Sequence, residues 1–258
     1  MRGAFLLATV VAAASAHAGE PTLLALTRTG GLVRFPADRP GDGRPVPVSG
    51  VAGVLVGIDV RPADGRLYGL SAASELYRVD PETGRAEVVA SLTVPFDGEA
   101  RSGIDFNPLA DRLRLVSADG QNLRVHPTLG AVAVDRPLTW KAGDPNAGKR
   151  PQITAAAYSR NVPGAADTKL FVIDAERDVL ALQDPPNDGI LATVGPLGVD
   201  FGPLGGFDIW TDAAGQDHPW AASGDVLYAV DLATGAARSL GTIAGADAGV
   251  VSLAAVPP

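Results

Sequence analysis

The stretch Gly57-Ile58-Asp59-Val60-Arg61-Pro62 decides the fold, because it recurs as Gly103-Ile104-Asp105-Phe106-Asn107-Pro108. Each copy leads at the same offset into a second apolar segment, Arg66-Leu67-Tyr68 after the first copy and Arg112-Leu113-Arg114 after the second. Units that repeat at intervals of roughly 50 residues are supersecondary units that bury their apolar faces only against neighbouring units. The repeat therefore predicts a ring or an array of stacked units.

The repeat continues around the chain, where weaker copies begin at Ala155, Gly206 and Ser252. The last copy is cut short at Pro258, but Thr22–Leu26 and Gly31–Phe35 resemble the second and third strands of the other units. A C-terminal strand paired with N-terminal strands closes a ring without an unpaired edge. We predict an all-β fold, a five-bladed β-propeller of four-stranded blades closed in this way. A β-sandwich with fortuitous internal similarity is the alternative.

The turns between these segments support short strands rather than helices. Val79-Asp80-Pro81-Glu82-Thr83-Gly84 and Val230-Asp231-Leu232-Ala233-Thr234-Gly235 have the same pattern. The Asp side chain accepts backbone N–H groups two residues on, and Gly takes the positive-φ position. The 31 Gly and 21 Pro also favour many tight turns over long helices.

The N-terminus has the pattern of a secretory signal. Arg2 precedes the apolar run Ala4–Ala14, and Ala16-His17-Ala18 is a small-x-small cleavage site. We therefore expect residues 1–18 to be a signal peptide and residues 19–258 to form one propeller domain in the periplasm or outside the cell. The apolar run is too short to span a membrane as a helix, and no later segment predicts a span.

Composition excludes several kinds of function. The net charge is −8, which argues against nucleic acid as a partner, because phosphate binding requires a basic surface. The chain has no Cys, so disulfides, thiolate metal sites and a cysteine nucleophile are excluded. No pair of His residues has the spacing of a catalytic zinc site.

The repeat places three carboxylates, Asp59, Asp105 and Asp208, at equivalent positions of the innermost strands, where the other two units carry Ala157 and Ala254. Innermost strands line the channel, so the carboxylates are expected at one level of it. They could bind a cation such as Ca²⁺. They could also divide into acid and base for glycoside cleavage. The third interpretation is structural: each Asp accepts backbone N–H groups of the next blade.

The longest connection, Asp135–Pro151, and the shorter Pro95–Arg101 both join an outer strand to the next inner strand. We expect them on one face at the channel mouth, since long loops on rigid scaffolds often carry binding sites. The candidate ligand-binding residues are Trp140, Lys141, Asp144, Glu99 and Arg101. The alternative makes Trp140 a buried plug and leaves the charges in solvent.

A weaker signal lies on the third unit. Gln121-Asn122 with Arg114 and Arg124 could form a polar patch, although such residues are usually solvated at strand edges.

The chain resembles the bacterial secreted domain of unknown function DUF4394. The resemblance is carried by Ser102–Pro108, Asp111–Arg114, Gly120–Arg124, Gly143–Gly148, Ala155–Tyr158, Pro185–Gly189 and Gly206–Asp208, and it covers nearly all of residues 23 to 256. It implies an exported bacterial domain and brings no established activity or catalytic residue.

Three functional hypotheses remain open at this stage. The leading one is a non-enzymatic binding module for a small polar ligand, glycan or partner protein. The second is a carbohydrate-active hydrolase that uses the channel carboxylates, and the third is a structural domain that interacts with the cell envelope. None of these patterns requires a cofactor, and Ca²⁺ is the ion that they could hold.

Overall fold

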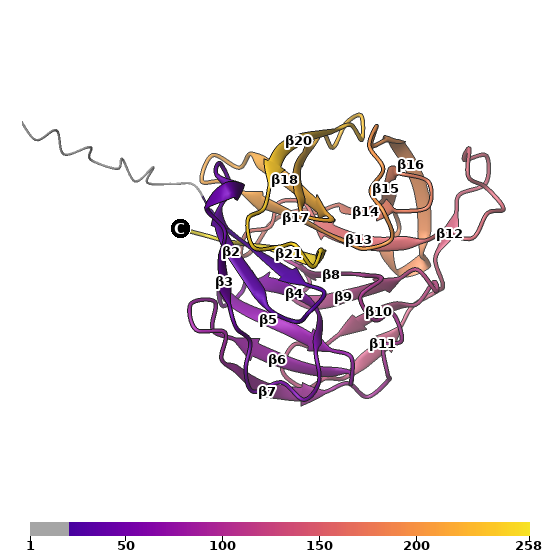
Figure 1. Ribbon diagram of the computed structural model, residues 1–258. Coiled ribbons are helices and arrows are strands. Elements are labelled where there is room, and N and C mark those ends of the chain that lie inside the picture. Colours follow the sequence, from indigo (N-terminus) through magenta and orange to yellow (C-terminus); the bar gives the residue numbers. More distant parts are fainter. Residues whose placement is uncertain (1–20) are drawn as a thin grey trace, which may run out of the picture.

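The computed structural model describes residues 21–258, which form five antiparallel β-sheets arranged around a central axis (Figure 1). The prediction of a five-bladed propeller is confirmed. The expected signal peptide at residues 1–18 lies outside the described residues and stays a prediction. Within residues 21–258, no helix has the length and apolar character needed to cross a bilayer.

We number the blades along the chain and give the strands of each from the channel outward. Blade 1 consists of β21 (Val250–Val256), β1 (Thr22–Thr27), β2 (Leu32–Pro36) and β3 (Arg44–Val46). Blade 2 consists of β4 (Leu55–Arg61), β5 (Arg66–Ser71), β6 (Glu75–Val79) and β7 (Ala86–Ser91). Blade 3 consists of β8 (Ser102–Asn107), β9 (Arg112–Ser117), β10 (Asn122–Val125) and β11 (Val132–Val134).

The last two blades follow the same order, with one addition. Blade 4 consists of β13 (Ile153–Tyr158), β14 (Leu170–Asp174), β15 (Val179–Gln183) and β16 (Ile190–Pro196), and β12 (Thr139–Trp140) adds a fifth strand outside β16. Blade 5 consists of β17 (Gly205–Thr211), β18 (Asp217–Ser223), β19 (Val226–Val230) and β20 (Ala237–Thr242). Two short 3₁₀ helices, η1 (Pro40–Asp42) and η2 (Pro186–Asp188), occur in connections.

The ring closes as predicted, by pairing of the two ends of the chain. Thr22 lies opposite Val256 and Leu26 opposite Ser252 in the antiparallel pair of β1 and β21. Figure 1 shows the C-terminal strand returning beside the N-terminal strands. Because β21 is the inner strand of blade 1, every blade obtains a channel-lining strand.

The glycines of the repeated Gly-Ile-Asp motif are required by close approach of neighbouring inner strands. A Cβ atom at Gly57 would lie 2.1 Å from Cδ1 of Ile104 on the next inner strand, and one at Gly103 would lie 2.5 Å from Ala156. Gly206 is equivalent, since its Cβ would lie 2.2 Å from the backbone N of Leu253. The absence of a side chain at these positions lets the strands pack around a narrow channel.

The core consists of apolar layers between successive blades, which we call seams. The seam between blades 2 and 3 is apolar on both sides: Tyr68 and Leu70 from blade 2 meet Phe106 and Leu113 from blade 3. The seam between blades 3 and 4 differs, because Val116 is the one residue from the strands of blade 3 in its described apolar cluster. Arg114 and Asn122 of blade 3 are also buried at this seam, and both are polar.

Candidate functional site

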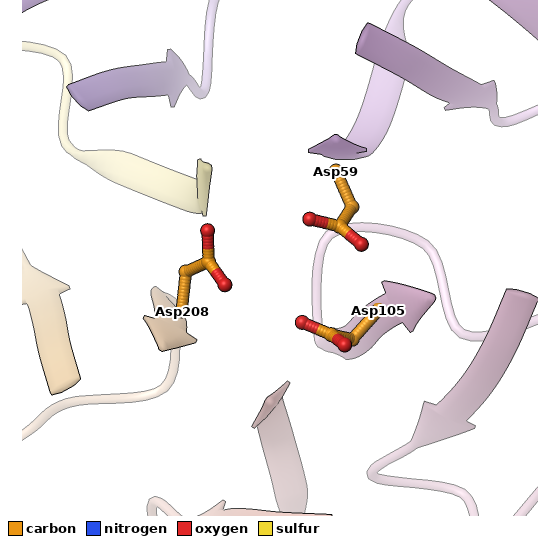
Figure 2. Close-up of side chains that lie close together, drawn as sticks. All are labelled: Asp59, Asp105 and Asp208. Atoms are coloured by element: carbon orange, nitrogen blue, oxygen red, sulfur yellow. The ribbon is translucent and has the colours of Figure 1, made fainter. Parts of the chain in front are cut away.

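The channel holds a triad of carboxylates, as the repeat predicts. Asp59 comes from β4, Asp105 from β8 and Asp208 from β17, and all three point toward the axis (Figure 2). One oxygen of each lies within 4.8 Å of those of the other two. Each residue is 1% exposed, so the triad is a buried acidic cluster at one level of the ring.

Each carboxylate also links its blade to the next. Asp59 accepts a hydrogen bond from the backbone N–H of Phe106 at 2.6 Å, across the seam between blades 2 and 3. Asp105 accepts one from Tyr158 at 3.1 Å, and Asp208 accepts one from Ala255 at 2.5 Å. Each Asp therefore accepts a backbone hydrogen bond from the next blade, as the structural interpretation predicts. These hydrogen bonds do not exclude a bound ion.

The three carboxylates differ in how fully their oxygens are used. The second oxygen of Asp59 accepts from the N–H of Val60 at 2.7 Å, and that of Asp208 accepts from Ile209 at 2.6 Å. Oδ2 of Asp105 is buried and has no hydrogen-bond partner among the described residues. A buried carboxylate oxygen without a partner is costly, so a proton or a cation at this atom would be favourable.

Burial and mutual repulsion both disfavour three negative charges here. Burial raises the pKa of Asp59 well above its ordinary range, and the charge of Asp208 adds to the effect. Burial also raises the pKa of Asp105, followed by the charges of Asp59 and Asp208. Burial raises the pKa of Asp208 to about 6, against backbone hydrogen bonds that lower it. Each of these shifts favours the protonated carboxyl group in the metal-free cluster.

The donor set fits a hard cation. Carboxylate oxygens are the ligands that Ca²⁺ and Mg²⁺ prefer, and each oxygen that accepts one N–H still has a second lone pair. The triad offers no nitrogen or sulfur ligand, which argues against a zinc site.

The triad is closed to large substrates. Glycoside hydrolysis places two carboxyl groups roughly 5–9.5 Å apart on either side of an accessible bond. Here the oxygens converge within 4.8 Å and the residues are 1% exposed. A sugar chain cannot reach them in this conformation.

The loop that contains Trp140 lies elsewhere than expected. Trp140 belongs to β12, which pairs in parallel with β16, the outer strand of blade 4, and the N–H of Lys141 donates to the carbonyl of Leu191. This part of the loop lies on the outer rim of the ring rather than at the channel mouth, so that expectation is wrong (Figure 1). By pairing there, β12 covers the outer edge of β16, whereas within residues 21–258 the outer strands of the other four blades have no further strand beside them.

The side chains of this loop have mostly structural contacts. Trp140 is 5% exposed and packs in the apolar cluster of blade 4, as the buried-plug alternative predicts. Asp144 accepts hydrogen bonds from the N–H and hydroxyl of Thr193 at 2.7 and 2.9 Å and from the N–H of Asn146 at 2.8 Å. Burial raises the pKa of Asp144, but these hydrogen bonds outweigh burial and bring it below the ordinary value. Lys141 is exposed.

Glu99 and Arg101 are exposed at the inner end of the preceding loop, and Arg101 donates to the side chain of Gln152 at 2.9 Å. Among the described residues, Glu99 and Arg101 make no hydrogen bond or ion pair with Trp140, Lys141 or Asp144. The two loops do contact the same turn between β9 and β10, through Asp97 with Gln121 and through Arg150 with Asp119. A binding role for Glu99 and Arg101 stays a prediction.

Arg114 is the residue that the sequence interpretation misplaced. It is 1% exposed rather than solvated at a strand edge. The repeat could have indicated that Arg114 is unusual. Arg114 lies opposite Asp105 on the neighbouring strand. The residues opposite the equivalent channel positions of the other blades are Leu24, Tyr68, Phe171 and Trp220. An arginine where four blades place apolar side chains marks a departure from the scaffold.

A family model described as "Domain of unknown function (DUF4394)" matches residues 31–254. The match covers most of the chain, so the chain belongs to this family, and the resemblance in its sequence motifs is confirmed. No curated protein matches the chain.

Solved structures are similar in fold at low identity. A structural genomics protein of unknown function from Bacteroides thetaiotaomicron has a TM-score of 0.54 at 16% identity, with 86% of this chain and 55% of that chain covered. A calcium-binding protein, regucalcin, from Agrobacterium tumefaciens has a TM-score of 0.49 at 15% identity, covering 86% and 73%. An auxiliary nutrient binding protein from Bacteroides ovatus has 0.48 at 14% identity, covering 84% and 57%. The chain spans little more than half the length of the first of these structures. These likenesses concern the fold alone.

Proposed function

We propose that this member of the DUF4394 family is a non-enzymatic, exported propeller that holds a calcium ion in its channel. We further propose that its surface binds a small polar ligand, glycan or partner protein. The observation that carries the calcium proposal is the Oδ2 atom of Asp105, which is buried beside two further carboxylates and has no partner within residues 21–258. A cation there would satisfy this oxygen and neutralise the cluster.

Calcium suits the triad better than magnesium. Mg²⁺ requires near-ideal octahedral geometry and keeps several waters, whereas Ca²⁺ accepts six to eight oxygens in irregular arrangements. The oxygens here are fixed by hydrogen bonds to neighbouring blades, so their geometry cannot adjust freely. The carboxylates would supply part of the coordination shell of Ca²⁺.

The ion would act by connecting blades. Asp59, Asp105 and Asp208 lie on inner strands of blades 2, 3 and 5, which are distant in sequence. A ligand that binds the assembled ring and not the unfolded chain stabilises the ring through linkage. The export that we propose is compatible with a calcium site, because calcium-binding modules outside the cell work with dissociation constants of about 10⁻⁴–10⁻³ M.

We do not propose the hydrolase that the sequence left open. The carboxylates are 1% exposed, whereas glycoside hydrolysis requires two carboxyl groups on either side of an accessible bond.

The test is refolding with and without calcium. Because the site is buried, the mature chain, residues 19–258, should be unfolded in denaturant with a chelator and refolded metal-free. Calcium should then raise the melting temperature in a saturable way, by the equivalent of about 2.7 kcal/mol at a concentration one hundred times the dissociation constant. Elemental analysis after desalting should give one Ca²⁺ per chain, and magnesium should have a smaller effect.

The variant Asp105→Asn separates an ion from a structural acceptor. Its amide can still accept from Tyr158, but it removes the charge and the oxygen that has no partner. We expect a folded protein that calcium does not stabilise. Asp119→Asn, an exposed carboxylate on the same blade, is the control and should respond like the wild type. Equal calcium stabilisation in Asp105→Asn, or no effect of calcium on the wild type, would reject the proposal.

A further inference from the structure

The seam between blades 3 and 4 contains a polar network around Arg114. Nη1 of its guanidinium donates to Asn122 and to Asp135, both at 2.6 Å, and Nη2 donates to Asn187 at 2.7 Å. Nε donates to the hydroxyl of Tyr158 at 3.3 Å. A buried arginine in such a network seldom adds stability over a well-packed apolar side chain. The other four blades use the apolar solution at this position.

The network carries more positive than negative charge. Asp135 accepts from Arg114 at 2.6 Å and from Nε and Nη2 of Arg124 at 2.8 Å each, so one carboxylate serves two arginines. Arg112 is a third cation, and the nearby Asp111 pairs with Arg61 of blade 2. The guanidinium groups of Arg112, Arg114 and Arg124 therefore lie near two carboxylates, Asp135 and Asp111, and Asp111 is shared with Arg61.

These cations border a hollow of about 180 Å³ between blades 3 and 4. The three arginines of blade 3 line one side, and Tyr158, Pro186 and Asn187 of blade 4 line the other. The hollow is smaller than the roughly 300–1,000 Å³ of sites for drug-sized ligands, so its occupant must be small.

Hydrogen-bond donors remain at its wall. The hydroxyl oxygen of Tyr158 accepts from Arg114, so its hydrogen is available to another acceptor. Within residues 21–258, Arg112 donates to the carbonyl of Asp111, and Arg124 directs Nε and Nη2 to Asp135. Their remaining N–H groups can bind an acceptor, and arginine forks match oxyanions in geometry and charge.

We infer that the hollow between blades 3 and 4 binds a small oxyanion, a carboxylate, phosphate or sulfate, between Arg112, Arg114, Arg124 and the hydroxyl of Tyr158. An anion there balances the excess positive charge and accepts the remaining donors. It also explains an arginine at a position that the repeat otherwise fills with an apolar side chain. The site is distinct from the channel, which is lined by the three carboxylates.

Binding can be measured on the mature chain by calorimetry and thermal melts. The probes are sodium phosphate, sulfate, acetate and succinate, each compared with sodium chloride at the same ionic strength. We expect at least one oxyanion to give a saturable heat and a melting-temperature increase beyond that of chloride. The tetrahedral and planar probes then distinguish phosphate-like from carboxylate ligands.

Blade 2 provides a matched control. Arg66 and Arg78 hold the same strand positions as Arg112 and Arg124, and they line another hollow, but Tyr68 replaces Arg114 between them. The double variant R112A/R124A should weaken binding of the effective probe about tenfold or more, because charged hydrogen bonds are lost. R66A/R78A should bind it like the wild type.

The comparison of the two double variants requires that both remain folded. Arg112 and Arg124 are partly exposed, and Asp135 keeps Arg114 in the double variant, so the fold should survive. If R112A/R124A melts without cooperativity, the single variant R112A carries the test, with R66A as its control. The inference is overturned if no oxyanion binds beyond the effect of chloride, or if the blade 2 variant loses as much affinity as the blade 3 variant.

Discussion

The seam between blades 2 and 3 differs from the seam between blades 3 and 4 in the side chain at one equivalent position. In the first, Tyr68 packs edge-on against Phe106 with ring centroids 5.3 Å apart. In the second, the equivalent Arg114 is surrounded by Asn122, Asp135 and Asn187. One seam follows the repeat, and the other departs from it.

The carboxylates that accept hydrogen bonds across these two seams also differ, in how many of their oxygens have a partner. Asp59, at the apolar seam, uses both oxygens in hydrogen bonds, whereas Oδ2 of Asp105, at the polar seam, has no partner in the described part of the chain. A repeated scaffold stabilises itself through identical contacts, so positions with unsatisfied or charged groups are candidates for ligands. Both candidate sites of this protein depend on residues at the polar seam.

The largest effect is expected from truncation at the apolar seam. Tyr68→Ala removes a side chain that is 4% exposed and leaves a cavity beside Phe106. Chemical denaturation should show a loss of about 3–5 kcal/mol in the free energy of unfolding.

The matched change at the polar seam is Arg114→Met, which keeps side-chain length and removes the charge. It should cost less, about 1–3 kcal/mol, because Asn122 and Asn187 lose a donor while Asp135 retains Arg124. A larger loss for Arg114→Met than for Tyr68→Ala would mean that the arginine stabilises the ring more than apolar packing does.

The second prediction concerns pH in the metal-free protein. Asp208 has a pKa of about 6 in the fold, against an ordinary value of 3.8. Between these values the folded chain holds a proton that the unfolded chain has lost, so this contribution is present below pH 3.8 and disappears as the pH rises through about 6. The difference corresponds to about 3 kcal/mol, and Asp59 and Asp105 act in the same direction.

Denaturation of metal-free protein at a series of pH values measures this decline. Calcium should oppose it, because a bound cation favours the ionised carboxylates. Stability that rises between pH 4 and pH 7 without calcium would show that the triad is not protonated as burial predicts.

The last comparison concerns the two carboxylates that link neighbouring blades, and Asp105→Asn is expected to have the smallest effect. Asp59→Asn must place an amide nitrogen toward a backbone N–H, because both oxygens of Asp59 are acceptors, and it should cost about 1–3 kcal/mol. Asp105→Asn can direct its nitrogen toward the neighbouring carboxylates, so in metal-free protein it should cost less than about 1 kcal/mol. Equal losses in urea melts would indicate that the two links are equally satisfied.

Much of this architecture could be predicted from particular residues. The Gly-Ile-Asp repeat located the inner strands and the level of Asp59, Asp105 and Asp208, because residues at equal offsets occupy equal heights in a ring. The position of Trp140 could not be predicted, since a loop can cross a face or cover an edge, and the backbone of β16 decides between them.

The sequence by itself determined the number of blades, the closure by β21 and the three carboxylates at one level, because these follow from a period and from alternation along strands. Only the tertiary structure decided which oxygen lacks a partner and that Arg114 is buried. It also brought Asn122 and Asn187, which lie 65 positions apart in the sequence, to the same guanidinium. The period of the sequence fixes the position of each residue on its strand. The partners of its side chain depend on the neighbouring blade, and no local sequence pattern records the distance of that blade or the residues that face it.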